Sequence, residues 1–201
     1  MTGIVFALLL VSVLPAIASE LVERIAFGSC NKHDSEQPMW QVIQQHEPDV
    51  WIWTGDIVYG DTEDMALLRS KYEAQKAQPD YARLATTCDV IGIWDDHDYG
   101  ANDAGADYSE RAASQRIFVD FWGDGVDSPR RARSGVYTAH RYGPPGNRLQ
   151  VILLDTRYFR GPLAKGKRRV GGPYVPSADK NITMLGPAQW QWLERQLRLP
   201  A

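Results

Sequence analysis

Short apolar runs alternate with amphipathic segments along most of this chain. The runs at 50–54 and 90–94 are rich in β-branched and aromatic residues, which is typical of strands buried on both faces of a parallel sheet, and a shorter run at 23–27 precedes them. Apolar residues at helical spacing predict helices at 37–46, 66–78, 81–86, 109–122 and 186–197. Because strand and helix alternate, the pattern predicts an α/β layered domain.

The last third of the chain has a different pattern. Residues 134–142 and 148–155 predict two strands, and the Gly-Pro-Pro-Gly sequence at 143–146 predicts the turn of a hairpin between them. A hairpin added to parallel strands makes the sheet structure mixed. Residues 160–183 are polar and rich in Gly, Pro and Lys, so we expect a long surface loop there.

Composition is that of an ordinary globular domain. The 201 residues are 44% hydrophobic and 23% charged, which is enough for one domain with a real core, expected over 19–201. The net charge of -3 argues against a nucleic-acid-binding protein, whose affinity requires clustered positive charge.

Residues 1–18 have the features of a signal peptide. An apolar stretch too short to span a bilayer comfortably is followed by Ala16-Ile-Ala18, a small-residue pattern suited to cleavage after Ala18. We therefore expect a secreted or periplasmic protein with no transmembrane span after cleavage. The stretch lacks Lys and Arg at its start, which leaves a buried strand or an uncleaved anchor as alternatives. Asn181-Ile-Thr is an acceptor for glycosylation if the source is eukaryotic.

The three predicted parallel strands each end in side chains that bind metals. The first run ends at Cys30, the second at Asp56 with Tyr59 three residues later, and the third at Asp96 and His97. Because the carboxyl ends of parallel strands meet at one edge of a sheet, we expect these side chains to lie together. The pattern indicates a polynuclear metal site and metal-assisted hydrolysis.

The Asp-Asp-His-Asp sequence at 95–98 is the strongest of these motifs. Three acids and an imidazole directly after a buried strand require neutralising partners, and a cation supplies one. We expect Asp96 to bind metal and His97 to act as an acid or base, since the flanking acids raise the pKa of that imidazole. Asp95 is a candidate to support a ligand or to contact substrate.

Asp56, Tyr59 and the cysteines each allow two interpretations. A carboxylate such as Asp56 can bridge two metals and a phenolate such as Tyr59 suits Fe³⁺, although an Asp that caps a helix and a Tyr that packs beneath it would give the same sequence. Cys30 and Cys88 could form a disulfide. Because they fall at opposite edges of a parallel sheet, we favour a ligand role for Cys30 and burial for Cys88.

Polar residues outside the three strand ends add further candidates. Asn102 lies in the loop at 100–107, where it could fold over the site or simply form a turn. Asp155 and Arg157 follow the last predicted strand; Asp155 could orient a ligand while Arg157 contacts a phosphate oxygen, or the two could form an ion pair. His140 has no supporting partner in the sequence and is expected at the surface.

At these residues the chain resembles the alkaline phosphatase D, or PhoD-like, family of calcineurin-type metallophosphoesterases. The matching segments follow the order of the family over residues 24–197, at 27–31, 55–61, 93–98, 154–157 and 185–194. The resemblance implies a metallophosphoesterase-like four-layer α/β/β/α sandwich with mixed sheets. It also implies hydrolysis of small-molecule phosphate esters, either monoesters or diesters.

The resemblance further assigns the metals. It implies that Cys30, Asp56 and Tyr59 bind Fe³⁺, with Asp56 bridging to a second ion, often Ca²⁺ or another divalent metal. Asp96 would hold that second ion, and His97 would act near the leaving group.

One difference from the family concerns the end of the chain. Family members continue after the Trp-rich helix into strands that carry a Gly-Asp-x-His segment with further ligands, whereas this sequence stops at Ala201. The chain therefore resembles the N-terminal half to two-thirds of a family member, with an incomplete sandwich. Two functions are expected from this: an exported metal-dependent phosphoesterase, or a secreted protein that binds metal without catalysing hydrolysis.

Overall fold

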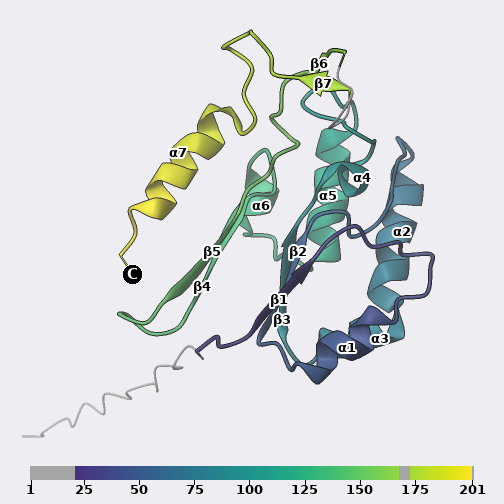
Figure 1. Cartoon of the computed structure of the whole chain (residues 1–201), viewed down its shortest axis with the longest axis vertical. Coiled ribbons are helices and arrows are strands. Elements are labelled where there is room, and N and C mark those ends of the chain that lie inside the picture. The colour runs from purple at the N-terminus through teal and green to yellow at the C-terminus, as the bar shows by residue number, and fades with distance from the viewer. Residues whose placement is uncertain (1–20, 168–172, 201) are drawn as a thin grey trace, which may run out of the picture.

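The computed structural model of the chain describes residues 21–167 and 173–200 (Figure 1). The elements in chain order are β1 (Ile25–Gly28), α1 (Met39–Gln45), β2 (Val50–Thr54), α2 (Met65–Ala77), α3 (Pro79–Leu84), β3 (Asp89–Ile93), α4 (Asp96–Tyr99), α5 (Arg111–Phe121), α6 (Pro129–Ala132), β4 (Thr138–Tyr142), β5 (Leu149–Leu153), β6 (Ala164–Lys165), β7 (Tyr174–Val175) and α7 (Gly186–Leu197).

The first sheet is parallel and has the order β1-β2-β3, as the apolar runs predict. The central strand β2 is buried along its first four residues, 50–53, because neighbours cover both of its faces. Its register pairs Gly28 with Trp53 and Trp53 with Gly92, so the three strands end at nearly the same level. The loops that follow them therefore start from one edge of the sheet.

Aromatic side chains fill the space between this sheet and its helices. Trp40 of α1 is fully buried and packs edge-on against Trp51 and Trp53, with ring centroids 5.1 and 5.3 Å away. Trp94, which follows β3, packs against Tyr99 and Phe118 at 4.9 and 5.0 Å. Such pairs add about 0.5–1.5 kcal/mol each beyond the area they bury, so they fix the helices against the strands from which the loops emerge.

A second sheet, formed by β4 and β5, completes a four-layer arrangement. The strands pair antiparallel, which confirms the predicted hairpin and the mixed sheet structure. In Figure 1 the hairpin lies between α7 and the parallel sheet, and α1, α2, α3 and α5 cover the far face of that sheet. The Tyr142 hydroxyl donates to Asp89 of β3 at 2.7 Å, and Trp192 of α7 packs on Tyr137 at 4.8 Å.

The structure differs from the predicted elements in the connecting segments. The strand expected at 134–142 begins only at Thr138, because side chains hold the preceding backbone: Gly135 N–H donates to Gln115 and Val136 N–H donates to Asp155. The short helices α4 and α6 were not predicted. The segment at 160–183 is largely loop, but it carries the short β6–β7 pair.

His140 is not at the surface, contrary to expectation. It lies in β4 opposite Val151, and the layers on either side of the hairpin half-bury it. Burial lowers the pKa of His140, with Arg130 acting in the same direction and Asp89 and Asp124 opposing it. A lone histidine in an alternating strand could not be assigned to a face, because the covering layers come from distant sequence.

No helix in the described part of the chain is long and apolar enough to cross a membrane. The signal peptide expected at 1–18 lies outside the described residues, as do residues 168–172 of the loop expected at 160–183. Asn181 is exposed.

Candidate metal centre

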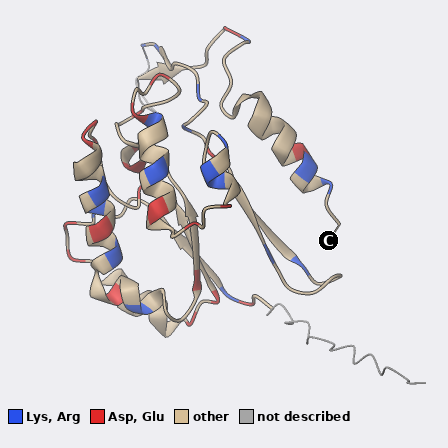
Figure 2. Cartoon of the chain, turned by 180° about the vertical axis from the view of Figure 1, so that it is seen from behind, with Lys and Arg blue, Asp and Glu red and all other residues tan. Residues whose placement is uncertain are grey.

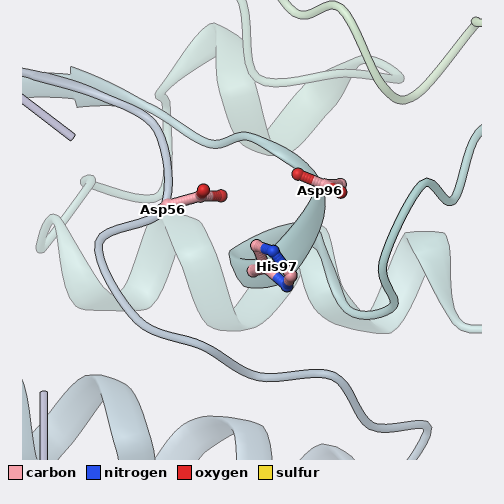
Figure 3. Close-up of side chains that lie close together, drawn as sticks. All are labelled: Asp56, Asp96 and His97. Atoms are coloured by element: carbon pink, nitrogen blue, oxygen red, sulfur yellow. The ribbon is translucent and has the colours of Figure 1, made fainter. Parts of the chain in front are cut away.

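The loops after β2 and β3 bring two carboxylates and an imidazole together. Asp56, Asp96 and His97 each offer one possible ligand atom, and these atoms all lie within 4.8 Å of one another. Figure 3 shows the two carboxylates pointing toward one another, with the His97 ring beside them. Asp56 and Asp96 are buried and His97 is half-buried, so one side of this group remains open to a ligand.

Cys30 and Tyr59 join the same group from the loops after β1 and β2. The Cys30 thiol donates to Asp56 Oδ2 at 3.6 Å, and the backbone N–H of Asn31 donates to the carbonyl of Asp56 at 2.9 Å. The Tyr59 ring lies against the His97 ring, with centroids 4.2 Å apart. The structure thus brings all five of the residues predicted at the strand ends to one place.

The group carries an excess of negative charge. Burial raises the pKa of Asp56, and the nearby Asp95 and Asp96 carboxylates raise it further. Burial together with Cys30 and Asp56 raises the pKa of Tyr59 to about 12. A cation among these side chains would oppose both shifts, because it would stabilise the carboxylate and the phenolate.

One buried oxygen supports a cation at this position. Asp56 Oδ1 is buried and has no hydrogen-bond partner among the described residues, whereas buried carboxylate oxygens are normally satisfied. The donors around it are a thiol, a phenol, two carboxylates and an imidazole, a mixture that suits transition metals together with hard divalent ions. The residues present therefore fit a metal centre.

Backbone strain is concentrated around the same group. Five non-glycine residues in the described ranges have positive φ, and four of them lie in these loops: Cys30 (58°), Asp56 (50°), Asp61 (46°) and Asp103 (56°). Such conformations cost on the order of 1–3 kcal/mol each and persist where the surrounding structure enforces them, most often at functional sites. The loops are held in shapes that place their side chains rather than in relaxed turns.

Gly55 allows the loops after β2 and β3 to approach closely. It adopts a φ of 111°, and a Cβ at this position would overlap Cβ of Asp95. Only glycine combines this backbone conformation with the absence of a side chain. The approach sets the separation of Asp56 from Asp96.

Arg157 reaches the site from the loop after β5. Its Nε donates to Asp95 Oδ1 at 2.6 Å, and its Nη2 lies 3.6 Å from Asp96 Oδ1. Burial would lower the pKa of Arg157, but its hydrogen bond to Asp95 and the charges of Asp95 and Asp96 raise it. Burial likewise opposes ionisation of Asp96, yet the N–H of Asp103 and the Arg157 charge lower its pKa overall.

Asp155 does not form an ion pair with the Arg157 side chain, so that alternative is wrong. It is fully buried, and its carboxylate accepts hydrogen bonds at 2.9 Å from Trp94 Nε1 and from the backbone N–H groups of Val136, Arg157 and Tyr158. The side chain of Gln189 in α7 forms two further hydrogen bonds with the Asp155 backbone, both at 2.8 Å: Oε1 accepts from the N–H, and Nε2 donates to the carbonyl. Asp155 thus fixes the loop that presents Arg157.

Asn102 does not fold over the group. It is exposed, and its Nδ2 donates to Asp103 Oδ2 at 3.0 Å. The loop contacts the site through its backbone instead, where Asp103 N–H donates to Asp96 Oδ2 at 2.8 Å. Tyr174 of β7 donates to Asp103 Oδ2 at 2.7 Å, so the β6–β7 segment is joined to the same loop.

The sequence assigned no role to Asp61, and it included Asp98 only as a member of the 95–98 motif. Both Asp61 oxygens lie 2.8–2.9 Å from Nδ1 of His97, and this pairing raises the pKa of His97 against the lowering effect of burial. Asp98 is fully buried and accepts from the N–H groups of Ile57 and Asp95, at 2.9 and 2.6 Å. Asp98 lies three residues after Asp95 at the start of α4, and this capping-box spacing could have predicted that its side chain bonds to the Asp95 backbone.

The two cysteines are free, and they lie at opposite ends of the parallel sheet. Cys30 follows the carboxyl end of β1, whereas Cys88 precedes β3. Burial raises the pKa of Cys88 to about 11. This placement confirms the expectation that the two cysteines lie at opposite edges of the sheet, and no disulfide joins them.

Comparison with known proteins assigns the chain to a family. The sequence model of the PhoD-like phosphatase family matches residues 25–201, which is most of the sequence. The chain belongs to the PhoD-like phosphatase family. A solved structure described as the structure of PhoD is similar, with a TM-score of 0.65, 21% sequence identity and coverage of 92% of this chain. No curated protein matches the chain.

The structural match supports the PhoD-like fold described above. The described elements, with parallel and antiparallel sheets in layers, agree with that fold. This chain spans 41% of the length of the solved PhoD chain.

Proposed function

We propose that this PhoD-like protein is an exported, metal-dependent phosphoesterase that acts on small-molecule phosphate monoesters or diesters. Membership of the PhoD-like phosphatases supports the reaction class. The observation that carries the site assignment is the buried, unpartnered Asp56 Oδ1 among acids that repel one another.

In this proposal Cys30, Asp56 and Tyr59 would hold Fe³⁺, and Asp96 together with Asp56 would hold a second ion, Ca²⁺ or another divalent metal. The donor types support this division, because thiolate and phenolate suit the ferric ion and carboxylate oxygens suit calcium. When bound, such ions polarise a phosphoryl group and lower the pKa of a bound water.

The side chains around the ions would position the substrate and move its proton. Nδ1 of His97 is held by Asp61, and its other ring nitrogen has no hydrogen bond within the described ranges, so it can donate a proton to the departing alcohol. Arg157 is fixed by Asp95 and lies beside Asp96, so its guanidinium can contact a phosphate oxygen and offset charge that develops in the transition state. Asp155 acts indirectly by fixing the loop of Arg157.

The experiment combines metal analysis, visible absorption and hydrolysis of a chromogenic phosphate ester. The purified protein should contain metal, should absorb visible light through tyrosinate or thiolate bound to Fe³⁺, and should lose activity with a chelator. His97→Ala should lower turnover by about 10²–10⁴-fold while retaining metal. Asp56→Ala should lose both ions, and full metal content in that variant would refute the bridging role.

His46→Ala is the matched control, since His46 is an exposed imidazole at the end of α1 and should leave turnover unchanged. Metal bound without turnover in the unaltered chain would instead support the metal-binding, non-catalytic function. Export belongs to the same proposal, and N-terminal sequencing of the secreted or periplasmic protein should find cleavage after Ala18.

A further inference from the structure

We propose that a pocket between α5 and α6 binds the phosphoryl group of a small organic phosphate or phosphonate, separately from the metal centre. The cavity has a volume of about 370 Å³, within the range of small-molecule sites. The residues that line it include four arginines: Arg116, Arg130, Arg131 and Arg133. In Figure 2 the basic segments of α6 lie beside α5.

The carboxylates near the pocket neutralise only part of its charge. Arg130 pairs with Asp124, and Arg131 pairs with Asp120 at 2.8 Å. Arg116 is exposed and forms no ion pair within the described ranges. Arg116 and Arg133 are therefore two guanidinium charges at this pocket without a carboxylate partner, in a protein whose net charge is -3.

Arg133 lines the cavity and carries a charge that no carboxylate pairs within the described residues. Its guanidinium stacks on the Tyr137 ring at 3.8 Å and lies 5.5 Å from the Trp192 ring. It donates to the Tyr137 carbonyl, but its Nε is buried and lacks a hydrogen-bond partner in the described structure. Burial and the like charge of Arg130 both lower the pKa of Arg133, so a bound anion would offset an existing cost.

The backbone that carries these arginines is fixed in advance. Gln115 of α5 is buried, and its amide donates to the carbonyls of Arg130 and Arg133 at 2.6 and 2.7 Å. Its Oε1 accepts from Gly135 N–H at 3.0 Å. A ligand therefore meets guanidinium groups on an ordered segment, which reduces the entropy lost on binding.

The lining indicates the class of ligand. Guanidinium forks match the oxygens of a phosphoryl group through paired hydrogen bonds. Ala112, Val119 and Tyr158 add apolar and aromatic side chains to the lining. This combination suits an anionic phosphoryl head joined to an apolar or aromatic group better than it suits a bare ion. The site does not depend on the proposed catalytic function.

The test uses inorganic phosphate and phenylphosphonate, which lacks a hydrolysable ester bond. Binding is measured by calorimetry at constant ionic strength with a chelator present, in the unaltered chain and in Asp96→Asn, which disables the metal centre. We expect both proteins to bind phosphate equally, and phenylphosphonate to bind several-fold more tightly than phosphate. Loss of binding in Asp96→Asn would overturn the proposal, and equal affinity for the two probes would overturn the role of the apolar side chains.

Arg116→Gln and Arg133→Gln should each weaken phenylphosphonate binding by at least tenfold. Arg116 is exposed, so its variant should fold normally, which circular dichroism checks. Arg195→Gln is the matched control, because it removes one exposed arginine from α7 and should leave the affinity unchanged. Unchanged affinity in Arg116→Gln, or an equal loss in Arg195→Gln, would show that only general charge attraction is present.

Discussion

Replacing Gln75 with leucine should destabilise the protein and loosen the metal centre together. Gln75 is a fully buried amide on α2. Its Oε1 accepts from Asn31 Nδ2 at 2.7 Å and from Gln37 Nε2 at 2.9 Å, and its Nε2 donates to Gln37 Oε1 at 3.2 Å. Asn31 in turn donates its backbone N–H to Asp56, so the network connects α2 to the loops that hold the site.

The size of the effect follows from these contacts. Three buried hydrogen bonds are lost, each with a net contribution of about 0.5–1.5 kcal/mol. Asn31 keeps the Ile57 carbonyl as a partner, and Gln37 keeps the Lys32 carbonyl and Trp40 Nε1, so neither amide is left wholly unsatisfied. Leucine has a similar volume and needs no desolvation, which recovers part of the loss. We expect a decrease in the free energy of unfolding of about 2–3 kcal/mol.

Urea unfolding monitored by circular dichroism measures this change. With a denaturant slope of about 2 kcal/mol/M, the midpoint of Gln75→Leu should fall by about 1–1.5 M. Gln191→Leu makes the same chemical change at an exposed position of α7 and should shift the midpoint by less than about 0.25 M. A Gln75→Leu midpoint equal to that of the control would refute the reasoning that this network supports the site.

Three other outcomes follow from local chemistry. At pH 8 Cys88, whose pKa is about 11, should react with iodoacetamide about 100-fold more slowly than an ordinary thiol, and peptide mapping should find exposed Cys30 labelled first. Burial lowers the pKa of His140 below 6.5, so the unfolded chain binds a proton at this residue more readily than the folded chain does. The free energy of unfolding should therefore fall as the pH drops from about 6.5 toward the folded pKa. Urea titrations at several pH values should show that His140→Gln reduces this dependence on pH. Gly55→Ala should cost at least about 2 kcal/mol in thermal unfolding, whereas Gly125→Ala, with open space around its Cβ, should cost less than about 1 kcal/mol; equal losses would refute the close-approach argument.

The parallel sheet and the position of the site could be predicted because local signals agree there. The run ending at Thr54 is apolar on both faces, and only a buried parallel strand fits it. Asp56 and Asp96 then had to share an edge, since parallel strands end together. Their approach to one another was therefore a consequence of topology, and the resemblance to PhoD-like proteins added the expected roles.

The remaining contacts depend on residues that only the folded chain brings together. Asp61 pairs with His97 across 36 positions of sequence, and Arg157 pairs with Asp95 across 62. No periodicity encodes such pairs. The late start of β4 has the same origin, because Gln115 and Asp155 take hydrogen bonds that would otherwise extend the strand.

The separation of the two cysteines has a consequence for the chemistry of the Cys30 thiol. The register aligns Gly28 with Trp53 and Trp53 with Gly92, so Cys30 and Cys88 lie roughly six residues, or about 20 Å, apart along the strand direction. A disulfide requires Cα atoms within about 7 Å. Under the proposed export, an oxidising compartment would therefore not join Cys30 to Cys88 within one molecule, and the Cys30 thiol would stay available to the neighbouring site residues.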